Sequence, residues 1–401
     1  MHAVSDPVSF DDTAVAFAHR SDADLNRAYR IYQLINNRPL TWLGTRLTPW
    51  AIQAGLPVKG LLRSTLFRLF CGGETLQECE EVIHRLSRFG VYTILDYGVE
   101  AKQREDEFDR TTDSILDAIR FAAPLSHVPF VSIKITGICR FALLEKRHAG
   151  VALSPEEQQE WQRVNDRLLR ICMAAQQHRI GVMVDAEESW IQDPIDELAD
   201  QMMQRFNRSS AVVLNTFQLY RHDRLAFLRR SFEAAQQGGY VLGAKLVRGA
   251  YMEKERRRAA RLGYASPIQP DKAACDRDFD EAIRFCLHRL SAVFLCVASH
   301  NEKSNLLATQ LARQLRYPAD HPHLWFSQLF GMSDNITFNL THAGFRAAKY
   351  LPYGPVAEVV PYLMRRAQEN TSVAGMSSRE LLLLRRERQR RKKSDRHAAV
   401  S

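Results

Sequence analysis

VYTILD (residues 91–96) is the first of eight short segments that are rich in β-branched and aromatic residues. The other segments are VSIKI (131–135), VMVD (182–185), VVLNT (212–216), AKLV (244–247), FLCVA (294–298), WFSQL (325–329) and AKYL (348–351). Each is followed by a polar or amphipathic stretch that is long enough for a helix. Short, largely apolar strands are typical of a sheet that is covered on both faces. The alternation predicts an α/β fold, a (β/α)8 TIM-type barrel.

The segments on either side of the predicted barrel have a different character. Residues 1–90 are predicted to form an N-terminal helical arm, since SDADLNRAYRIYQLI begins with a capping Ser21 and has apolar residues at helical spacing. Residues 91–378 would form the catalytic barrel, and residues 379–401 a basic C-terminal tail. Much of the net charge of +9 lies in this tail, because residues 379–397 hold nine Lys/Arg against three acids. The rest of the chain is nearly balanced, which argues against a nucleic-acid partner.

The composition is that of an ordinary globular protein, with 45% apolar and 25% charged residues. The seven cysteines are scattered without a CxxC motif, which favours a reducing compartment and argues against a zinc ribbon or a disulfide framework. No apolar run approaches the ~18 residues that span a bilayer. We therefore expect a cytoplasmic protein without a metal, at most peripheral at the inner face of a membrane.

The functional site is predicted at the carboxyl ends of the strands, where the active sites of such barrels lie. Almost every strand ends in a residue that titrates or forms hydrogen bonds. These residues are Asp96, Lys134, Asp185, Asn215, Lys245 with Arg248, His300 with Asn301, Gln328 and Tyr350. Lys134 and Asp185 follow neighbouring strands and are expected to pair, either to orient a substrate or as a rim ion pair. A Schiff-base lyase built on Lys134 is an alternative, but it requires an uncharged amine, which Asp185 disfavours.

The segment KLVRGAY (245–251) places two cations beside small residues at a strand exit. Such a segment suits a phosphorylated or flat ligand that approaches the backbone. The motifs GxGxxG and GxxxxGK[ST] are absent, so a nucleotide cofactor would not be held by a Rossmann turn or a P-loop. The basic stretch that follows is equally typical of a solvated helix face.

The segment YLPYGPVAEVVPYLMRRAQENTS (350–372) reads as a strand end, a turn and a helix. One face of this helix carries Tyr362, Arg365, Arg366 and Glu369. Periodicity alone fits a solvated face on which Arg365 pairs with Glu369. The position after the eighth strand favours a site for a carboxylate or phosphate, because adjacent arginines can bind such groups in a bidentate manner.

Together these segments resemble the proline dehydrogenase family of FAD-dependent enzymes. The motifs VSIKITG, VDAEES, NTFQLY, KLVRGAYMEKER, ASHN, QLFGMSDN and the segment 350–372 occur in the family's order, and the resemblance runs from Phe10 to Ser378. Asn215 and Lys245 stand where the bifunctional bacterial members have Gln and Arg, so the chain looks like the monofunctional, mitochondrial-type branch. The resemblance implies a distorted (β/α)8 barrel with non-covalent FAD in its mouth.

The resemblance also implies roles for individual residues. The substrate site would comprise Lys134, Asp185, Leu329, Tyr350, Tyr362, Arg365 and Arg366, with the arginines and Lys134 at the substrate carboxylate. FAD would be held by Asn215, Lys245, Val247, Arg248, Gly249, Ala250, Ser299, His300 and Asn301, with Glu369 helping to set the flavin environment. Glu100 would pair with Arg366 as a gate that closes the site.

The implied reaction is the oxidation of L-proline to Δ1-pyrroline-5-carboxylate by hydride transfer to flavin N5, the first step of proline catabolism. Electrons would pass to a membrane quinone. A separate pyrroline-5-carboxylate dehydrogenase is expected downstream, because the chain is too short to hold that enzyme as well. The stretch LLLL (381–384) beside the basic run is expected either to lie on an anionic membrane or to fray in solvent. The nearest alternative is hydroxyproline dehydrogenase, in which a smaller serine replaces Tyr350.

Overall fold

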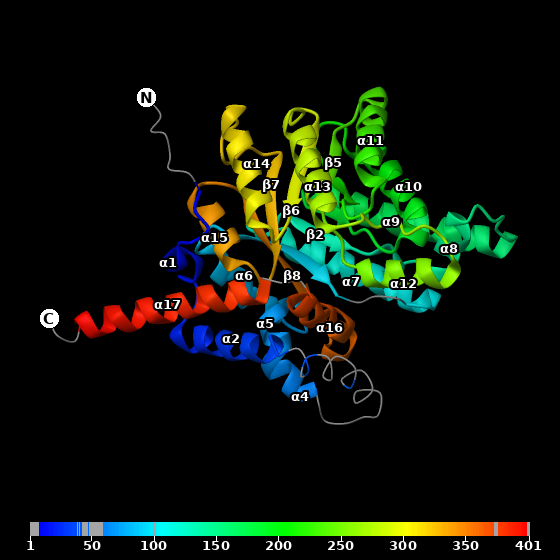
Figure 1. Ribbon diagram of the computed structural model, residues 1–401. Coiled ribbons are helices and arrows are strands. Elements are labelled where there is room, and N and C mark those ends of the chain that lie inside the picture. The colour runs from blue at the N-terminus through cyan, green and yellow to red at the C-terminus, as the bar shows by residue number, and fades with distance from the viewer. Residues whose placement is uncertain are drawn as a thin grey trace. The chain divides into compact units, whose positions relative to one another are not determined.

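The computed structural model describes residues 8–37, 39, 41, 47, 59–98, 102–372 and 376–398. Eight strands close into a barrel, and each strand lies beside its neighbour in the sequence (Figure 1). The strands are β1 (Tyr92–Tyr97), β2 (Phe130–Ile133), β3 (Gly181–Val184), β4 (Val213–Gln218), β5 (Leu242–Val247), β6 (Val293–Ala298), β7 (Leu324–Leu329) and β8 (Ala347–Tyr353). Each predicted segment overlaps a strand, so the predicted (β/α)8 fold is confirmed.

The barrel interior is closely packed. An aromatic cluster forms where Phe130 of β2 meets Trp325 of β7, with ring centroids 5.0 Å apart and the planes nearly perpendicular. Gly243 of β5 allows a close approach of β4, since a Cβ at this position would lie 2.1 Å from the carbonyl oxygen of Val213. The strands therefore form a filled core, which leaves their carboxyl ends as the place for a site.

The chain divides into two compact units, one of Met1–Tyr92 with Gln328–Ser401 and one of Thr93–Ser327. The first of these units joins the N-terminal arm with β8 and the C-terminal segment. The boundaries expected at residues 90 and 378 stay predictions.

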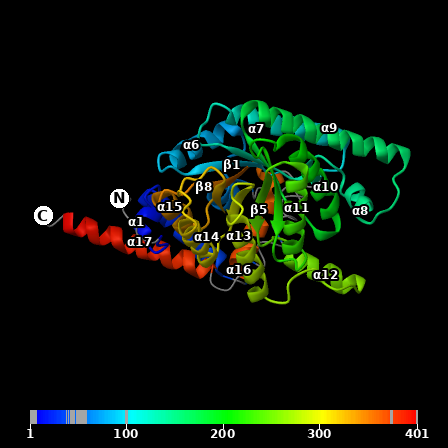
Figure 2. The same ribbon diagram turned by 90° about the horizontal axis from the view of Figure 1, so that it is seen from above.

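The unit Thr93–Ser327 holds most of the barrel strands together with the helices that follow them. Its helices are α7 (Glu105–Ala122), η2 (Ile135–Gly137), α8 (Phe141–His148), α9 (Pro155–His178), α10 (Ser189–Phe206), α11 (Arg224–Gly238), α12 (Met252–Leu262), α13 (Lys272–Leu287) and α14 (Glu302–Gln314). The long helix α9 lies beside α7 (Figure 2). It begins where it does because Ser154 and Glu157 form a reciprocal capping box and Pro155 occupies the first turn.

The other unit holds α1 (Thr13–Ala16), α2 (Asp22–Ile35), α4 (Lys59–Leu62), η1 (Arg63–Phe67), α5 (Arg68–Phe70), α6 (Leu76–Ser87), α15 (Asp334–His342), α16 (Val356–Ser372) and α17 (Met376–Ala398). The helix α2 starts as the sequence predicts, because the Ser21 hydroxyl accepts a hydrogen bond from the Asp24 backbone N–H at 3.1 Å. The core of this unit includes Val359, Val360 and Leu363 of α16, the apolar arc that the segment 350–372 predicts.

The C-terminal segment is a helix that runs alongside α2 (Figure 1), and the alternative of a frayed tail is wrong. Leu383 and Leu384 are buried in the core of the unit, while Leu382 is 42% exposed. Most of the leucine run therefore packs against protein and is not available to a membrane. No helix in the described part of the chain is long and apolar enough to cross a bilayer.

Candidate active site

Charged side chains from four strands or the residues directly after them meet in one largely buried cluster. Lys134, directly after β2, donates to Oδ2 of Asp185 at 3.0 Å, and Lys245 of β5 donates to Oδ1 of the same carboxylate at 2.5 Å. The Ser132 hydroxyl donates to this Oδ1 at 2.9 Å. The ammonium group of Lys134 also lies 3.7 Å from Asp96 of β1. Two ammonium groups thus balance two carboxylates.

The expected pair of Lys134 and Asp185 is therefore present. The side chains of Lys134, Asp185 and Lys245 are 11%, 14% and 4% exposed. Charges at such depth persist when they are paired and hydrogen-bonded. A lysine that forms a Schiff base needs a neutral amine, and two nearby carboxylates favour the ammonium form. The geometry therefore disfavours the lyase alternative.

Arg248, just beyond the end of β5, is held on several sides. Its Nε and Nη2 both donate to Oδ1 of Asp276 on α13, at 2.9 and 2.7 Å. The hydroxyls of Ser299 and Ser304 accept from Nη1 and Nη2 at 2.8 and 3.0 Å. The guanidinium also stacks over the Phe279 ring, 4.3 Å from its centroid. These contacts fix a cation at the carboxyl end of β5.

The backbone after Arg248 adopts a conformation that requires glycine. Gly249 has a φ of 137°, and a Cβ there would lie 2.4 Å from the ring of Tyr220. Val247 is half-buried, whereas Gly249 and Ala250 are exposed. The segment thus presents little side-chain bulk, as the sequence predicts.

The residues that follow β6 form the start of α14. The Asn301 side chain accepts hydrogen bonds from two N–H groups of the first turn, at 2.9 and 3.2 Å. The Ser299 hydroxyl accepts hydrogen bonds from Nη1 of Arg248 and from the Asn301 backbone N–H. His300 is half-buried. Within the described residues, no group of three or more His, Cys, Asp or Glu side chains is arranged to hold a metal ion.

Asn215 does not lie at the end of its strand. β4 continues to Gln218, and the Asn215 amide donates to Asp196 on α10 at 2.9 Å. The next residue, Thr216, pairs in register with Lys245, whose side chain reaches the Asp185 cluster. Side chains alternate along a strand, so Asn215 faces the helix layer. The contact with a cofactor that is expected for Asn215 stays a prediction.

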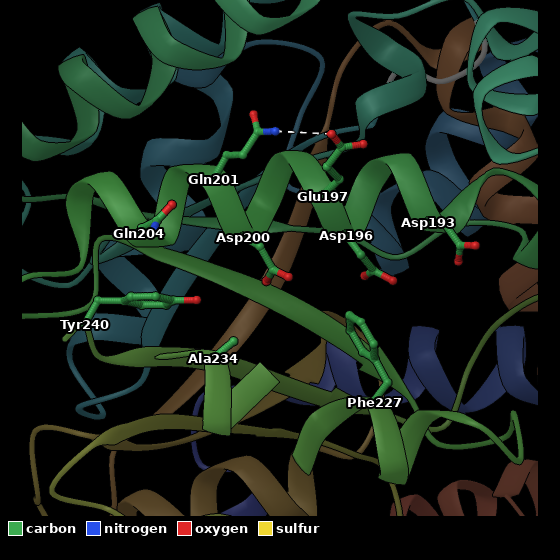
Figure 3. Close-up of a pocket in the computed structure, with 9 residues that line it drawn as sticks. All are labelled: Asp193, Asp196, Glu197, Asp200, Gln201, Gln204, Phe227, Ala234 and Tyr240. Atoms are coloured by element: carbon green, nitrogen blue, oxygen red, sulfur yellow. Dashed lines mark hydrogen bonds between the residues drawn. The ribbon is translucent and has the colours of Figure 1, made fainter. Parts of the chain in front are cut away.

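An open groove of about 490 Å³ lies along the face of α10 that carries Asp196 (Figure 3). It is lined by Asp193, Asp196, Glu197, Asp200, Gln201, Gln204, Phe227, Ala234 and Tyr240. Asp196 and Asp200 project from α10 toward the aromatic rings on the opposite wall. An acidic lining repels carboxylates and phosphates, so this groove does not suit an anionic ligand.

The helix α16 carries the pair of arginines expected to bind a carboxylate. Arg366 and Tyr362 are each 6% exposed, and the Arg366 guanidinium lies 5.2 Å from the centroid of the Tyr362 ring. Arg365 is half-buried. This face is therefore not the ordinary solvated surface that periodicity allowed. Cations shielded from water attract an anion more strongly than cations in solvent.

The remaining expected substrate residues lie in the same unit as α16. Tyr350 of β8 is 8% exposed, and its carbonyl accepts a hydrogen bond from the Phe330 N–H at 2.9 Å. Leu329 ends β7 and packs half-buried against the core of that unit. Glu369 belongs to α16, but its side chain is outside the described part of the chain, as is Glu100 altogether. The roles expected for these two glutamates stay predictions.

Sequence reasoning did not single out two buried polar residues at the strand ends. Gln218 ends β4, and its Nε2 donates to the carbonyl oxygen of Glu187 at 2.7 Å. Glu187 lies two residues after Asp185 and is 3% exposed. Burial raises the pKa of its carboxyl group to about 8. Side chains alternate between the two faces of β4, so this pattern would have placed Gln218 on the same face as Thr216. That inference requires knowing that the strand extends to Gln218.

The sequence model of the family described as proline dehydrogenase matches residues 79–379. The chain is 35% identical to the carbapenem antibiotics biosynthesis protein CarD of Pectobacterium carotovorum subsp. carotovorum, over 83% of this chain and 86% of that protein. It is 32% identical to the mitochondrial proline dehydrogenase 1 of Dictyostelium discoideum, over 84% of this chain and 66% of that protein. It is also 32% identical to the hydroxyproline dehydrogenase of Xenopus laevis, over 87% of this chain and 80% of that protein.

Solved structures of proline utilization A share the fold. The crystal structure of this protein from Bdellovibrio bacteriovorus, inactivated by N-propargylglycine, superposes with a TM-score of 0.71 at 20% identity. The match covers 90% of this chain and 38% of that chain, so this chain spans less than half the length of its structural relative. At this identity the match supports the barrel architecture alone.

The closed barrel and its charged strand ends define an α/β-barrel of the type that carries enzyme active sites. The family match covers most of that barrel, and curated relatives reach 35% identity over most of the chain. The chain belongs to the proline dehydrogenase family of oxidoreductases.

Proposed function

We propose that this chain oxidises L-proline to Δ1-pyrroline-5-carboxylate with FAD as its cofactor. The observation that carries the proposal is the buried cluster in which Lys134 and Lys245 share the Asp185 carboxylate. Fixed charges of both signs suit a small zwitterion, which has a carboxylate and an amine. Membership of the proline dehydrogenase family supports the choice of proline.

The proposed task of the substrate residues is orientation. We assign the substrate carboxylate to Lys134, Arg365 and Arg366, since charge-assisted bonds from arginine fix the direction of a carboxylate as well as its place. Asp185 keeps the Lys134 ammonium in position. Leu329, Tyr350 and Tyr362 would shape the pocket around the ring. A ring held in one orientation presents the same C–H bond to the acceptor at each encounter, which lowers the entropic part of the barrier.

The residues at the ends of β5 and β6 fit a flavin dinucleotide. The fixed guanidinium of Arg248 and the amino end of α14 both favour diphosphate oxygens. We assign the cofactor to Asn215, Lys245, Val247, Arg248, Gly249, Ala250, Ser299, His300 and Asn301, with Glu369 as a contributor. When bound, the flavin accepts a hydride from the carbon next to the substrate nitrogen. The Glu100–Arg366 gate remains part of the proposal.

The visible spectrum of the purified protein tests this proposal. We expect a yellow protein with a flavin spectrum that bleaches when L-proline is added without oxygen. A colourless protein that cannot be reconstituted with FAD, or a flavin spectrum that L-proline leaves unchanged, would contradict it.

Hydroxyproline is the alternative substrate, because a hydroxyproline dehydrogenase is among the relatives. The bulk of Tyr350 favours proline, since the hydroxyproline branch is expected to have serine at this position. Turnover of both substrates by the same preparation separates the two. A higher kcat/KM for trans-4-hydroxyproline would assign the chain to the alternative.

The electron acceptor is proposed to be a membrane quinone, and α17 offers a surface for membrane contact. Among its described side chains, Arg385, Arg386, Arg390, Lys392 and Lys393 are exposed, whereas Glu380 and Glu387 are buried. The exposed face is therefore cationic without an exposed acid among the side chains described. Since Leu383 and Leu384 are in the core, the contact would be electrostatic, without insertion of the leucine run.

The membrane contact is tested with the combined variant Arg385→Gln, Lys392→Gln and Lys393→Gln. Removing the whole helix would expose the core of its unit, so substitution is the cleaner change. At ~1 kcal/mol for each cation, binding to vesicles that contain phosphatidylserine should fall about a hundredfold in low salt. Binding that is equal for the variant and the original chain would rule out this surface.

A further inference from the structure

Glu187 connects the end of β3 to the turn that carries Lys134. One oxygen of its carboxylate accepts a hydrogen bond from the Thr136 backbone N–H at 3.0 Å, and the other bonds the Thr136 hydroxyl. Thr136 lies in the short helix η2, for which Lys134 is the N-terminal flanking residue. The Lys134 carbonyl in turn accepts from the Gly137 N–H at 3.0 Å. One buried side chain thus holds the backbone that follows Lys134.

The backbone of Glu187 is itself fixed from two directions. Its N–H donates to Oε1 of Gln192 on α10 at 2.8 Å, and its carbonyl accepts from Gln218 of β4 at 2.7 Å. Gln192 donates onward to Asp196 at 3.0 Å. Gln192 and Gln218 are at most 3% exposed. The Glu187 carboxylate therefore has little freedom to leave Thr136, and three strand ends are joined through one residue.

We infer that Glu187 is a positioning residue of the proposed proline site, which fixes the place of the Lys134 ammonium through Thr136 and sets the local charge that an anionic ligand meets there. The inference rests on the proposed function, in which Lys134 binds the substrate carboxylate. Glu187 itself is buried behind Thr136 and need not touch the substrate.

The charge of Glu187 changes in an accessible pH range. Burial, which is the largest cause, and the nearby carboxylate of Glu188 raise its pKa to about 8, while Thr136 and Lys134 oppose the rise. The Cys139 thiol also lies close enough to sense the charge of Glu187. Ionisation above pH 8 adds a negative charge near Lys134, which weakens the attraction for a carboxylate ligand. Ligand binding should therefore weaken as the pH rises through about 8.

The test uses tetrahydrofuran-2-carboxylate, which has a five-membered ring and a carboxylate but no amine that could titrate. Its affinity for the flavin-loaded protein is measured by calorimetry from pH 6 to pH 9. Glu187→Gln can keep both contacts with Thr136 but carries no charge, so the step in affinity near pH 8 should vanish. Glu187→Ala loses both contacts, and its affinity should lie about tenfold below that of Glu187→Gln at every pH.

Two further variants make the test specific. Glu188→Gln is the matched control, because Glu188 is the next residue and pairs with Lys254 on α12. It should keep the affinity at pH 6 and still show the step, which should move to lower pH because Glu188 no longer raises the pKa of Glu187. Thr136→Val keeps the backbone bond and loses only the hydroxyl, so it should show a smaller loss than Glu187→Ala. If Glu187→Ala does not fold, Thr136→Val and Glu187→Gln still test the inference.

The inference is overturned if Glu187→Gln retains the pH step, or if the folded variants at Glu187 and Thr136 bind the probe as the original chain does. A fall in melting temperature without any change in affinity would reduce Glu187 to a structural role. Failure of the proposed function appears differently. In that case the unaltered, flavin-loaded chain would not oxidise L-proline, whatever the Glu187 variants do to probe binding.

Discussion

The ammonium group of Lys245 lies 2.5 Å from Oδ1 of Asp185, so β5 is tied to the end of β3 across the intervening β4. The other oxygen of the same carboxylate is occupied by Lys134 at 3.0 Å. One buried acid therefore keeps two cations apart and oriented, and the geometry of the cluster depends on it.

Asp185→Asn should for that reason damage both binding and stability. The amide cannot neutralise two ammonium groups, which would then repel each other in a buried place. We expect kcat/KM for L-proline to fall about a hundredfold and the free energy of unfolding to fall by about 3 kcal/mol. Steady-state kinetics and thermal melts measure the two effects. Asp193→Asn, at a side chain that is 66% exposed, should change neither, and equal effects of the two variants would contradict the role given to Asp185.

Replacing the arginines of α16 should separate substrate binding from cofactor binding. Arg365→Met and Arg366→Met keep an unbranched, flexible stem but lose the guanidinium group and its charge. We expect each change to raise KM for L-proline about a hundredfold, because a charge-assisted bidentate contact is lost, while the flavin content per chain stays constant. Arg256→Met, at an exposed position of α12, is the control. A loss of flavin with an unchanged KM would assign these arginines to the cofactor.

The barrel could be predicted from the sequence because its strands are short and apolar and alternate with stretches that are long enough for a helix. The first and last residues of each strand could not be predicted from the sequence. VVLNT gave no sign that β4 continues through Phe217 to Gln218, and this small shift changed which polar residue ends the strand. Asn215 was consequently placed in the barrel mouth, whereas its amide bonds Asp196 in the helix layer. Side-chain direction in a strand depends on register, which one sequence does not reveal.

The C-terminal helix shows a different limit. A leucine run beside a basic run has the same composition whether it packs on protein or lies on a membrane. Long-range contacts decide which of the two occurs, such as the hydrogen bond that the Glu380 carboxylate accepts from the backbone N–H of Ser333. The spacing of residues in the sequence does not indicate such contacts. The arginines of α16 were singled out from the sequence because they are adjacent and follow the last strand, and the anion site that they indicate stays a prediction.

Tyr350→Ser should change the choice of substrate. Tyr350 is 8% exposed in β8, and its replacement by serine would open space for a ring hydroxyl and provide a hydrogen-bonding partner. We expect kcat/KM for trans-4-hydroxyproline to rise relative to that for L-proline by about tenfold. Tyr350→Phe keeps the bulk and should leave the ratio within about threefold. A ratio that serine does not alter would show that substrate choice lies elsewhere in the pocket.

Glu380 should make the chain less stable as the pH rises toward neutrality. This residue of α17 is 7% exposed, and burial, with the adjacent charge of Asp334, raises its pKa from 4.5 to about 7. The folded chain therefore binds a proton that the unfolded chain has released, so the stabilisation is complete below pH 4.5 and disappears as the pH rises to about 7. Glu380→Gln can still accept the Ser333 N–H but has no proton to lose. Relative to the original chain it should gain up to about 3 kcal/mol between pH 5 and pH 8.

The neighbouring acid of the same helix provides a control of opposite sign. Glu387 is bonded by Arg390 and Arg391, which hold its pKa below the usual range. Its stabilisation is present above pH 4.5 and is lost on further acidification, so Glu387→Gln should destabilise the chain at pH 7 and have less effect at pH 4. Melting temperatures from pH 4 to pH 8 measure both variants. If the two glutamine variants shift with pH in the same direction, ionisation of Glu380 does not control the stability of the unit that contains α17.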